Sequence, residues 1–349
     1  MKAQILIDGK TYSNDRPFIV AEIGINHNGD MELAKDCIAA AAEAGADSAK
    51  FQNYRTEDFV SNRSLMFTYK SQGKEITEPQ FDMFKRCELK REQLFLLKEE
   101  CDKYKLNFHS TPTSLEGIQD LQEIGCTLLK NGSDYLTQLD LIRSMGETGL
   151  TTVLSTGMAT LAEIEHAIVA FKETGNEQLI LLHCTSSYPT PPQEVNLARL
   201  ATLSSAFSMP VGFSDHSAGT TASIGATILG SCWIEKHFTL DRSLMGPDHW
   251  FSMDPKELSN LVKAVREATM VVGSSQILPT NSEELGRRDF RLSCVAKSNL
   301  EKGTILSESS IAFRRPGYGI PPREVSYIMG RKLSSSVSIG GVFTPDMFD

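Results

Sequence analysis

Two stretches of the chain end an apolar run with ionisable residues. The segment 233–238 reads WIEKHF, and a few residues upstream VGFSDH ends in Asp215 and His216. Buried charge is costly unless it is paired or bound to a metal. Two imidazoles, His216 and His237, at the ends of neighbouring strands therefore predict a site for a divalent metal ion, with carboxylates nearby. The alternative is that one or both histidines only form hydrogen bonds at the rim of the fold.

The predicted metal shell is only half filled by the protein, so water or substrate oxygen must complete it. An open shell of nitrogen and oxygen ligands suits Mn²⁺, Mg²⁺ or Co²⁺ better than a closed structural zinc site. We expect Mn²⁺, with Mg²⁺ and Co²⁺ as the alternatives.

A second set of polar residues at strand ends predicts a pocket for a small anion. It consists of one lysine and four hydroxyl side chains: Lys50, Thr111, Ser133, Ser155 and Ser214. Hydroxyls donate hydrogen bonds to anion oxygens, and a lysine supplies compact positive charge. A single serine or threonine at a strand end is more often a turn residue than a ligand. Their recurrence on five strands predicts a phosphorylated or carboxylated small molecule.

Glu22 lies in an otherwise apolar strand, IVAEIGIN. Burial raises the pKa of a carboxyl group unless a cation offsets it. We expect Glu22 to act as a general acid or as a partner of the metal's water. The alternative is a salt bridge to Lys50 or Lys236 that only stabilises the fold. After the last strand, the loop SLMGPDHWF is expected to place Asp248 and His249 over the substrate.

These residues require a fold that gathers strand ends in one place. Short apolar, β-branched runs alternate with segments of helical periodicity, at a spacing near the roughly 30 residues of a βαβ unit. Strands are predicted at residues 18–26, 48–54, 107–113, 127–133, 151–157, 179–186, 210–216 and 232–240. Eight such units predict an α/β fold, a (β/α)₈ TIM barrel of about 250 residues with its chemistry at the C-terminal strand ends. A doubly wound open sheet is the main alternative, but it usually carries a glycine fingerprint that this sequence lacks.

The pattern changes after Ile277. Residues 278–289 are polar and predict a linker between a barrel domain over 1–277 and a small β-rich domain over 290–349. Strand candidates in this smaller domain are residues 292–298, 311–316 and 332–338. So small a domain gains burial by docking on the barrel or on a second copy of the chain.

The bulk composition excludes several classes of protein. The 349 residues are 40% hydrophobic and 23% charged, which is typical of soluble globular proteins. A net charge of -9 argues against a nucleic-acid or anionic-membrane partner. No apolar run approaches the roughly 20 residues that span a bilayer, and the first residues do not form a signal peptide. Seven cysteines without a CxxC pair indicate reduced thiols and a cytoplasmic location.

A set of longer motifs extends over nearly the whole chain. In order, they are EIGINHNGD, KFQNY, HSTP, KNGSDY, LSTGM, LLHCTSSYPTP, GFSDH, EKHFTLD, GPDHWFSMDP and FRRPGYG. As a set they resemble the N-acetylneuraminate (sialic acid) synthase family, including legionaminic acid synthases, and the tail resembles the antifreeze-protein-like (SAF) domain of those enzymes. The resemblance implies condensation of phosphoenolpyruvate with an N-acylated amino-sugar aldehyde and water. The acceptor would be N-acetylmannosamine or a 2,4-diacetamido-6-deoxy hexose, and the products N-acetylneuraminate or legionaminate and phosphate.

The resemblance also implies roles for individual residues. His216 and His237 match the metal ligands, and Glu22 matches the acidic group close to the metal-bound water. The positions that match substrate contacts are Lys50, Thr111, Ser133, Ser155 and Ser214 for phosphoenolpyruvate, Gln52 beside them, Glu235 near the metal, and Tyr188 and Asp248 for the sugar. Ser186 stands where bacterial sialic acid synthases usually have Asn, at a contact near the phosphate and the sugar.

The C-terminal residues match a contribution from a second subunit. Arg315 matches an arginine that reaches the sugar's N-acyl group in the partner's barrel, and Phe290 lies on the same approach. The resemblance therefore implies a domain-swapped homodimer.

Three other functions remain as alternatives. One is a pseudaminic acid synthase, although such enzymes usually differ from EIGINHNG in the first motif. Another is a non-catalytic relative that binds a sugar acid, against which the intact Glu22, Lys50, His216 and His237 argue. The last is a metal-dependent aldolase or a synthase acting on sugar phosphates, which would need a second basic cluster at the barrel mouth.

Overall fold

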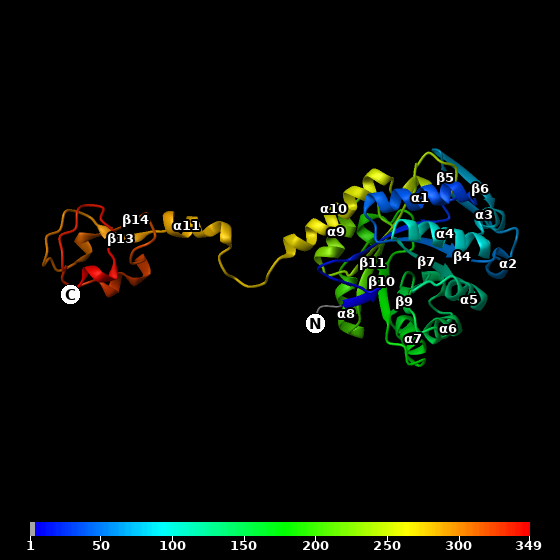
Figure 1. Ribbon diagram of the computed structural model, residues 1–349, viewed down its shortest axis with the longest axis horizontal. Coiled ribbons are helices and arrows are strands. Elements are labelled where there is room, and N and C mark those ends of the chain that lie inside the picture. Colours follow the sequence, from blue (N-terminus) through cyan, green and yellow to red (C-terminus); the bar gives the residue numbers. More distant parts are fainter. Residues whose placement is uncertain (1–3) are drawn as a thin grey trace. The chain divides into compact units, whose positions relative to one another are not determined.

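The computed structural model describes residues 4–349. The chain divides into two compact units, the first ending at Gly273 and the second spanning Ser274–Asp349 (Figure 1). Eight parallel strands of the first unit form a closed barrel, as predicted. They are β3 (Phe18–Gly24), β4 (Ser48–Asn53), β7 (Asn107–Pro112), β8 (Leu128–Asn131), β9 (Thr151–Ser155), β10 (Leu179–Cys184), β11 (Val211–Asp215) and β12 (Trp233–His237). Successive barrel strands are neighbours, and β12 pairs with β3 to close the ring.

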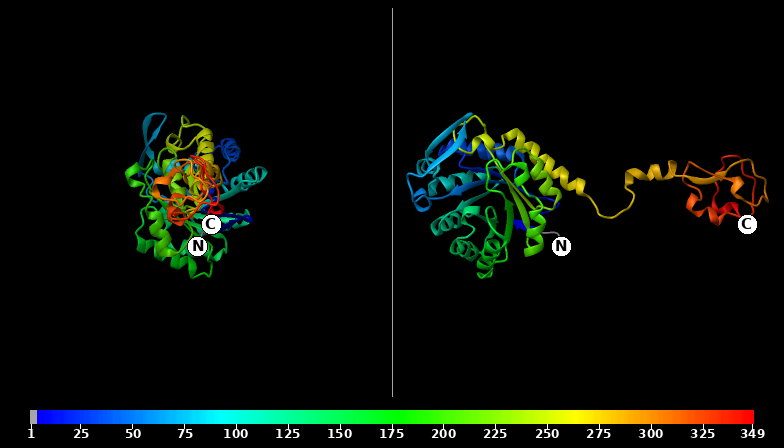
Figure 2. Two further views of the ribbon diagram at one scale, coloured as in Figure 1. Left: turned by 90° about the vertical axis from the view of Figure 1, so that its left-hand side faces the viewer. Right: turned by 180° about the vertical axis from the view of Figure 1, so that it is seen from behind.

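Helices cover the outside of the barrel (Figure 2). They are α1 (Met31–Ala44), α4 (Arg91–Lys103), α5 (Leu115–Glu123), α6 (Leu139–Glu147), α7 (Leu161–Lys172), α8 (Arg199–Phe207), α9 (Thr221–Ile228) and α10 (Pro255–Val272). Two further helices, α2 (Thr56–Phe59) and α3 (Gln80–Cys87), belong to the segment between β4 and α4. The start of α10 is encoded locally: Asp254 caps it, Pro255 takes the first position and Glu257 completes a capping box. Its apolar side, including the fully buried Leu258 and Leu261, packs on the barrel core.

A hairpin that the sequence analysis did not predict fills one end of the barrel. It consists of β1 (Gln4–Ile7) and β2 (Lys10–Ser13), whose apolar side chains pack inside the barrel among Phe18 and Trp233. Asp8 and Gly9 both have positive φ, 50° and 71°, at its two-residue turn. Asp-Gly between apolar strands is the strongest short-range hairpin signal, so the sequence did contain the information.

A second unpredicted hairpin lies between α2 and α3. It pairs β5 (Met66–Ser71) with β6 (Lys74–Pro79) in antiparallel register. Gln72 and Gly73 form its turn, with φ of 50° and 74°. The chain therefore leaves the barrel after β4 to form this hairpin before α4 returns it to β7.

The second unit has its own small core. It contains α11 (Glu284–Asp289) and an antiparallel pair of β13 (Ser293–Ala296) with β14 (Ile311–Arg314). The predicted strand at 332–338 is wrong: Lys332, Leu333 and Val337 make only isolated bridges. Three consecutive serines in this run supply no alternating apolar face, so nothing extends the pairing beyond single positions.

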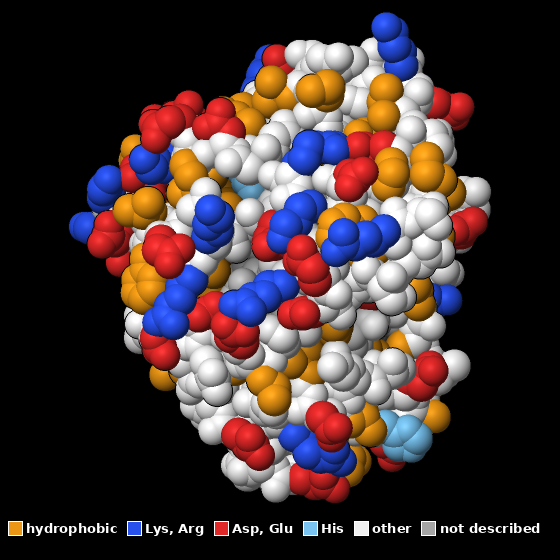
Figure 3. Space-filling view, turned by 90° about the vertical axis from the view of Figure 1, so that its right-hand side faces the viewer, with side chains coloured by type: hydrophobic (Ala, Val, Ile, Leu, Met, Phe, Trp, Pro, Cys, Tyr) orange, Lys and Arg blue, Asp and Glu red, His pale blue; other side chains and the backbone are white. Residues whose placement is uncertain are grey.

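The charged side chains at the surface and the cysteines show no unusual arrangement in the described residues. On the face shown in Figure 3, acidic and basic side chains are interspersed. All seven cysteines are buried and free. Within residues 4–349, no helix combines the length and the apolar character needed to cross a bilayer.

Candidate active site

A cavity of about 580 Å³ lies at the C-terminal ends of the barrel strands. All predicted site residues of the first unit except His249 line it: Glu22, Lys50, Gln52, Thr111, Ser133, Ser155, Ser186, Tyr188, Ser214, His216, Glu235, His237 and Asp248. The structure thus brings together residues that are more than two hundred positions apart in the sequence.

The strand register explains why these side chains meet. Glu22 on β3 pairs with Lys50 on β4 and with His237 on β12, and Ser214 on β11 pairs with Glu235 on β12. Because side chains alternate across a strand, partners at the same register of a barrel point the same way. Here they point inward, so the polar layer sits above the apolar barrel core.

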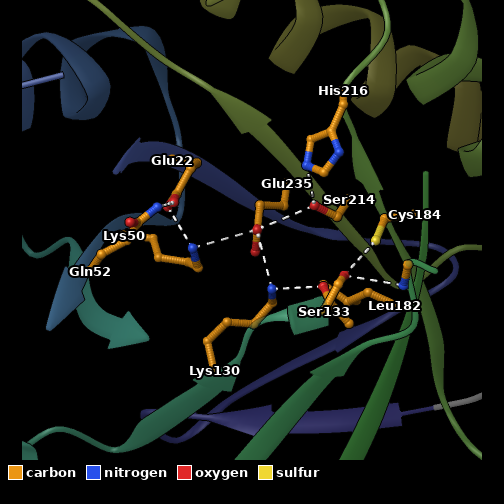
Figure 4. Close-up of polar contacts among 12 residues, drawn as sticks. Glu22, Lys50, Gln52, Lys130, Ser133, Leu182, Cys184, Ser214, His216 and Glu235 are labelled. Carbon is orange, nitrogen blue, oxygen red and sulfur yellow. Dashed lines mark hydrogen bonds and ion pairs between the residues drawn. The ribbon is translucent and has the colours of Figure 1, made fainter. Parts of the chain in front are cut away.

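Four buried charges form a chain across the bottom of the cavity (Figure 4). The Nζ of Lys50 lies 2.7 Å from Oε2 of Glu22 and 3.7 Å from Oε1 of Glu235. The Nζ of Lys130 lies 3.4 Å from the same oxygen of Glu235 and donates a 2.8 Å hydrogen bond to Ser155. Glu235 therefore holds two lysines at the anion pocket, where the sequence analysis chose only one.

Lys130 is the main functional residue that the sequence analysis missed. It is buried, lines the cavity and ends the apolar strand β8 much as Lys50 interrupts β4. A lysine inside a buried strand needs a partner. That signal was present in TLLKNGS, and it points to the same pocket.

Burial and neighbouring charge shift the pKa values of the two glutamates of this cluster in opposite directions. Burial raises the pKa of Glu22, and the attraction of Lys50 offsets this only in part. For Glu235, burial acts in the same direction, but Lys130 and Lys50 outweigh it and lower its pKa. Two carboxyl groups with opposite shifts take different roles. Glu235, which lies between the two lysines, is thus the more firmly ionised of the two carboxyl groups, and Glu22 is the more readily protonated.

The two predicted metal ligands are adjacent in the cavity. The imidazole centroids of His216 and His237 lie 5.5 Å apart. Nδ1 of His216 donates a 2.8 Å hydrogen bond to the carbonyl of Thr185, so the lone pair is on Nε2, which lies 3.4 Å from the hydroxyl of Ser214. Burial lowers the pKa of His216 to about 4 and that of His237 well below its usual value. Both rings are thus neutral, as metal ligation requires.

These residues fit a divalent ion with an open shell. Nδ1 of His237 is buried without a hydrogen-bond partner. Within the part of the chain that the structure describes, no group of three or more His, Cys, Asp or Glu side chains converges as a metal site. The protein would therefore supply His216 and His237, and water or substrate oxygen would supply the rest.

Other strand-end histidines do not belong to the cavity. His109 contacts Ser48 at 2.7 Å inside the barrel, and His183 contacts the carbonyl of Val195 at 2.6 Å. His27 is buried too. Burial and hydrogen bonds inside the barrel account for these three histidines.

The expected position of His249 is also wrong. It is fully buried and contacts Thr239 at 2.7 Å, so it anchors the loop, while its neighbour Asp248 lines the cavity. For Glu22, the salt bridge offered as an alternative does form, with Lys50. Lys236 instead pairs with Asp215 at 3.0 Å, away from the cavity lining.

Glycines allow close approach at both sides of the cluster. Gly24 has a φ of 54° at a break in the β3–β4 register, and a Cβ there would lie 3.1 Å from Oε1 of Glu22. Gly157 donates its N–H to Ser133 at 3.1 Å, and a Cβ there would lie 2.7 Å from the same hydroxyl. A side chain at either position would displace polar groups of the pocket.

The wider side of the cavity is aromatic. The ring of Tyr188 lies 4.2 Å from that of His216, and Phe251 packs 5.2 Å from His237. Burial and the charge of Glu22 raise the pKa of Asp248 to about 7. The hairpin β5–β6 also contributes lining residues here, none of which the sequence analysis selected.

The two predicted residues of the tail lie together in the second unit. The guanidinium of Arg315 stands 5.3 Å from the centre of the Phe290 ring. Phe290 is 61% exposed, so this pair presents an aromatic and a cationic group at the surface of its unit.

Two family models match this chain. The model of the NeuB family matches residues 37–277, and that of the SAF domain matches residues 293–349. The chain belongs to the NeuB family. It is an enzyme, a phosphoenolpyruvate-condensing nonulosonic acid synthase with a C-terminal SAF domain. The predicted family, fold and enzyme class are therefore confirmed.

NeuB relatives with different products are similar to this chain. It is 40% identical to the N,N'-diacetyllegionaminic acid synthase of Legionella pneumophila over 327 residues, 93% of this chain and 92% of the relative. It is 34% identical to the pseudaminic acid synthase of Helicobacter pylori over 321 residues, 91% and 94% of the two chains. The crystal structure of an N-acetylneuraminic acid synthetase from Leptospira borgpetersenii aligns with a TM-score of 0.74 and 34% identity, over 82% of this chain and 95% of that one.

Proposed function

We propose that this NeuB enzyme condenses phosphoenolpyruvate with an N-acylated amino-sugar aldehyde and water, to give N-acetylneuraminate or legionaminate and phosphate. The observation that carries the proposal is the pair of buried lysines around Glu235, in the same cavity as two neutral imidazoles. One part of the cavity suits an anion and the other suits a metal-activated carbonyl, and condensation needs both within reach.

The anion end is assigned to phosphoenolpyruvate. Lys50 and Lys130 supply positive charge, and the hydroxyls of Ser133, Ser155 and Ser214 supply donors. Because Glu235 fixes both lysines before substrate arrives, little reorganisation is needed when phosphate leaves. Gln52, which donates to Glu22 at 3.3 Å, and Thr111 complete this side.

The NeuB family is metal-dependent, and His216 and His237 would hold the ion, for which we propose Mn²⁺. When bound there, a divalent ion supplies Lewis acidity toward the aldehyde oxygen. The lysines hold phosphoenolpyruvate with its C3 toward the aldehyde carbon, and a C–C bond forms between these two atoms as C2 becomes electron-deficient. The carboxylate of Glu22 takes a proton from the water that adds at C2, and this proton ends on the former aldehyde oxygen. The resulting adduct loses phosphate into the lysine pocket.

The acceptor end is assigned to a sugar without a phosphate group. Among the cavity-lining residues, the only lysine outside the buried cluster is Lys70, and Glu75 faces it across the hairpin. A phosphorylated acceptor would need more than one paired cation. Tyr188 and Asp248, next to the imidazoles, are assigned to the sugar, with Ser186 between the two substrates.

The tail is assigned to a second subunit. Arg315 and Phe290 offer a cationic group and an aromatic face to an N-acyl group. We propose that they complete the cavity of the partner in a domain-swapped homodimer.

Phosphate release tests the proposal directly. Purified protein with Mn²⁺ and phosphoenolpyruvate should release phosphate only when a suitable N-acylated aldose is added. A panel of such aldoses, with mass spectrometry of the products, separates N-acetylneuraminate, legionaminate and pseudaminate. No release with any of them would indicate a non-catalytic sugar-acid-binding relative.

A further inference from the structure

One side of the cavity is built from two loops that follow different barrel strands. Here these residues are named the acceptor wall: Phe67, Tyr69 and Lys70 of β5, with Trp250 and Phe251 of η3 (His249–Phe251). The anion end has lysines and hydroxyls, whereas this wall has four aromatic rings and a single ammonium group.

The acceptor wall is held together across the two loops. Nε2 of Gln72 donates to the carbonyl of Ser243 at 2.9 Å, and the N–H of Gly246 donates to Ser71 at 3.1 Å. The Nζ of Lys70 lies 5.2 Å from the centre of the Trp250 ring, so the cation is placed on an aromatic face.

The base of the hairpin is fixed as well. The hydroxyl of Tyr69 donates to Glu78 at 2.6 Å, and Arg86 on α3 binds both oxygens of Glu78, at 2.6 and 2.7 Å. These contacts preorganise the wall, which reduces the entropy lost when a ligand binds against it.

The exposure of this wall indicates what it contacts. The Phe67 side chain is 38% exposed although it faces a cavity, and it stacks on Tyr69 with centroids 6.0 Å apart. Aromatic surface left open inside a cavity favours a ligand with apolar groups. Methyl and amide groups gain contact with the four rings, whereas Lys70 is the single cation that this wall offers and Glu75 lies opposite it on β6.

We propose that the acceptor wall selects the acceptor by its end remote from the aldehyde, and that it takes a sugar carrying a methyl group and a second N-acyl group there. Phe67 and Trp250 are the specificity-determining residues. This rests on the proposed function, because only a condensing enzyme has an acceptor. It favours the 2,4-diacetamido-6-deoxy hexose over N-acetylmannosamine.

The test compares acceptors rather than overall rates. Wild-type protein should show kcat/KM for the 2,4-diacetamido-6-deoxy hexose about 10- to 100-fold above that for N-acetylmannosamine, which is the usual range for one group in an apolar pocket. Trp250→Ala and Phe67→Ala should each bring this ratio toward one by lowering kcat/KM for the diacetamido sugar. The KM for phosphoenolpyruvate should stay unchanged, which shows that the anion end is intact.

Matched controls come from the same hairpin. Met66, next to Phe67, is 53% exposed and does not line the cavity, and Lys74 is an exposed lysine at the turn. Met66→Ala and Lys74→Met should leave the acceptor ratio unchanged. Trp250→Phe, which keeps an aromatic face, should retain most of the preference even if Trp250→Ala folds poorly.

Two results overturn the inference in distinguishable ways. If phosphate release is normal but the acceptor ratio is the same in wild type, Trp250→Ala and Phe67→Ala, the wall does not select the acceptor, although the proposed function stands. If no aldose supports phosphate release by the wild-type protein, the proposed function fails, and the inference fails with it.

Discussion

Lys50 and Glu22 form a buried ion pair, with 2.7 Å between Nζ and Oε2, on adjacent strands of the barrel. The same ammonium group lies 3.7 Å from Glu235. Burial by itself lowers the pKa of Lys50, but the two carboxylates raise it overall, so the lysine remains charged. A permanent cation is therefore available to an anion inside the protein.

Replacing Lys50 removes that cation. Lys50→Met should lower kcat/KM for phosphoenolpyruvate by about 100-fold, because the bound anion loses a charged partner. It should also lower the free energy of unfolding by about 3 kcal/mol, because truncating one member of a buried charge pair leaves the other unpaired. Steady-state phosphate release measures the first effect, and urea unfolding the second. The matched control is Lys236→Met. Lys236 is buried against Asp215 but lies outside the cavity. This variant should therefore be less stable than the wild type but should keep the wild-type affinity for phosphoenolpyruvate. Unchanged kinetics in Lys50→Met would remove Lys50 from the site.

Metal removal should stop the reaction. A chelator should abolish phosphate release, and Mn²⁺ should restore it, because His216 and His237 are held neutral for ligation. Direct Mn²⁺ binding should fall at least about tenfold in His237→Ala, in line with the loss of one of two protein ligands. His166→Ala, at an exposed histidine on α7, should bind Mn²⁺ like the wild type. Full activity of metal-stripped protein would contradict the assignment.

Mixing two inactive variants tests the contribution of the tail. Arg315→Ala keeps an intact barrel, and His237→Ala keeps an intact tail. If tails act on the partner's barrel, half of the dimers after equilibration are mixed and each has one complete site, so about a quarter of wild-type activity should return. Phosphate release before and after mixing measures this. Arg315→Ala mixed with Lys50→Met should recover in the same way, and absence of recovery in both mixtures would show that each tail serves its own chain.

Acid should destabilise the fold through buried neutral histidines. Burial lowers the pKa of His27 from its usual 6.5 to about 4. Between these values the unfolded chain binds a proton that the folded chain does not, so the stabilisation is complete above pH 6.5 and is lost as pH falls toward 4. This histidine should contribute about 3 kcal/mol of that loss. In urea unfolding across this range, His27→Gln should show a shallower dependence on pH than wild type; equal slopes would mean that His27 titrates normally.

The local signals in the chain specify the barrel well. Alternation of apolar strand runs with helical periodicity placed all eight barrel strands, because the period of side-chain burial is set within each element. Two hairpins were missed although both carried turn signals, Asp8-Gly9 and Gln72-Gly73. Neither hairpin fits the repeating strand–helix unit, so the repeat hid them.

Which polar residues line the cavity was harder to predict from the sequence. His27, His109 and His183 also lie in or just after barrel strands, but only His216 and His237 line the cavity. Lys130 was passed over, although it shares Glu235 with Lys50.

By itself, the sequence determined which segments become strands and that polar side chains collect where those strands end, since both depend on neighbours a few positions apart. Only the tertiary structure decided which of these side chains face the cavity and which partner each one meets. That depends on the register between strands and on closure of β12 against β3, which join residues more than two hundred positions apart.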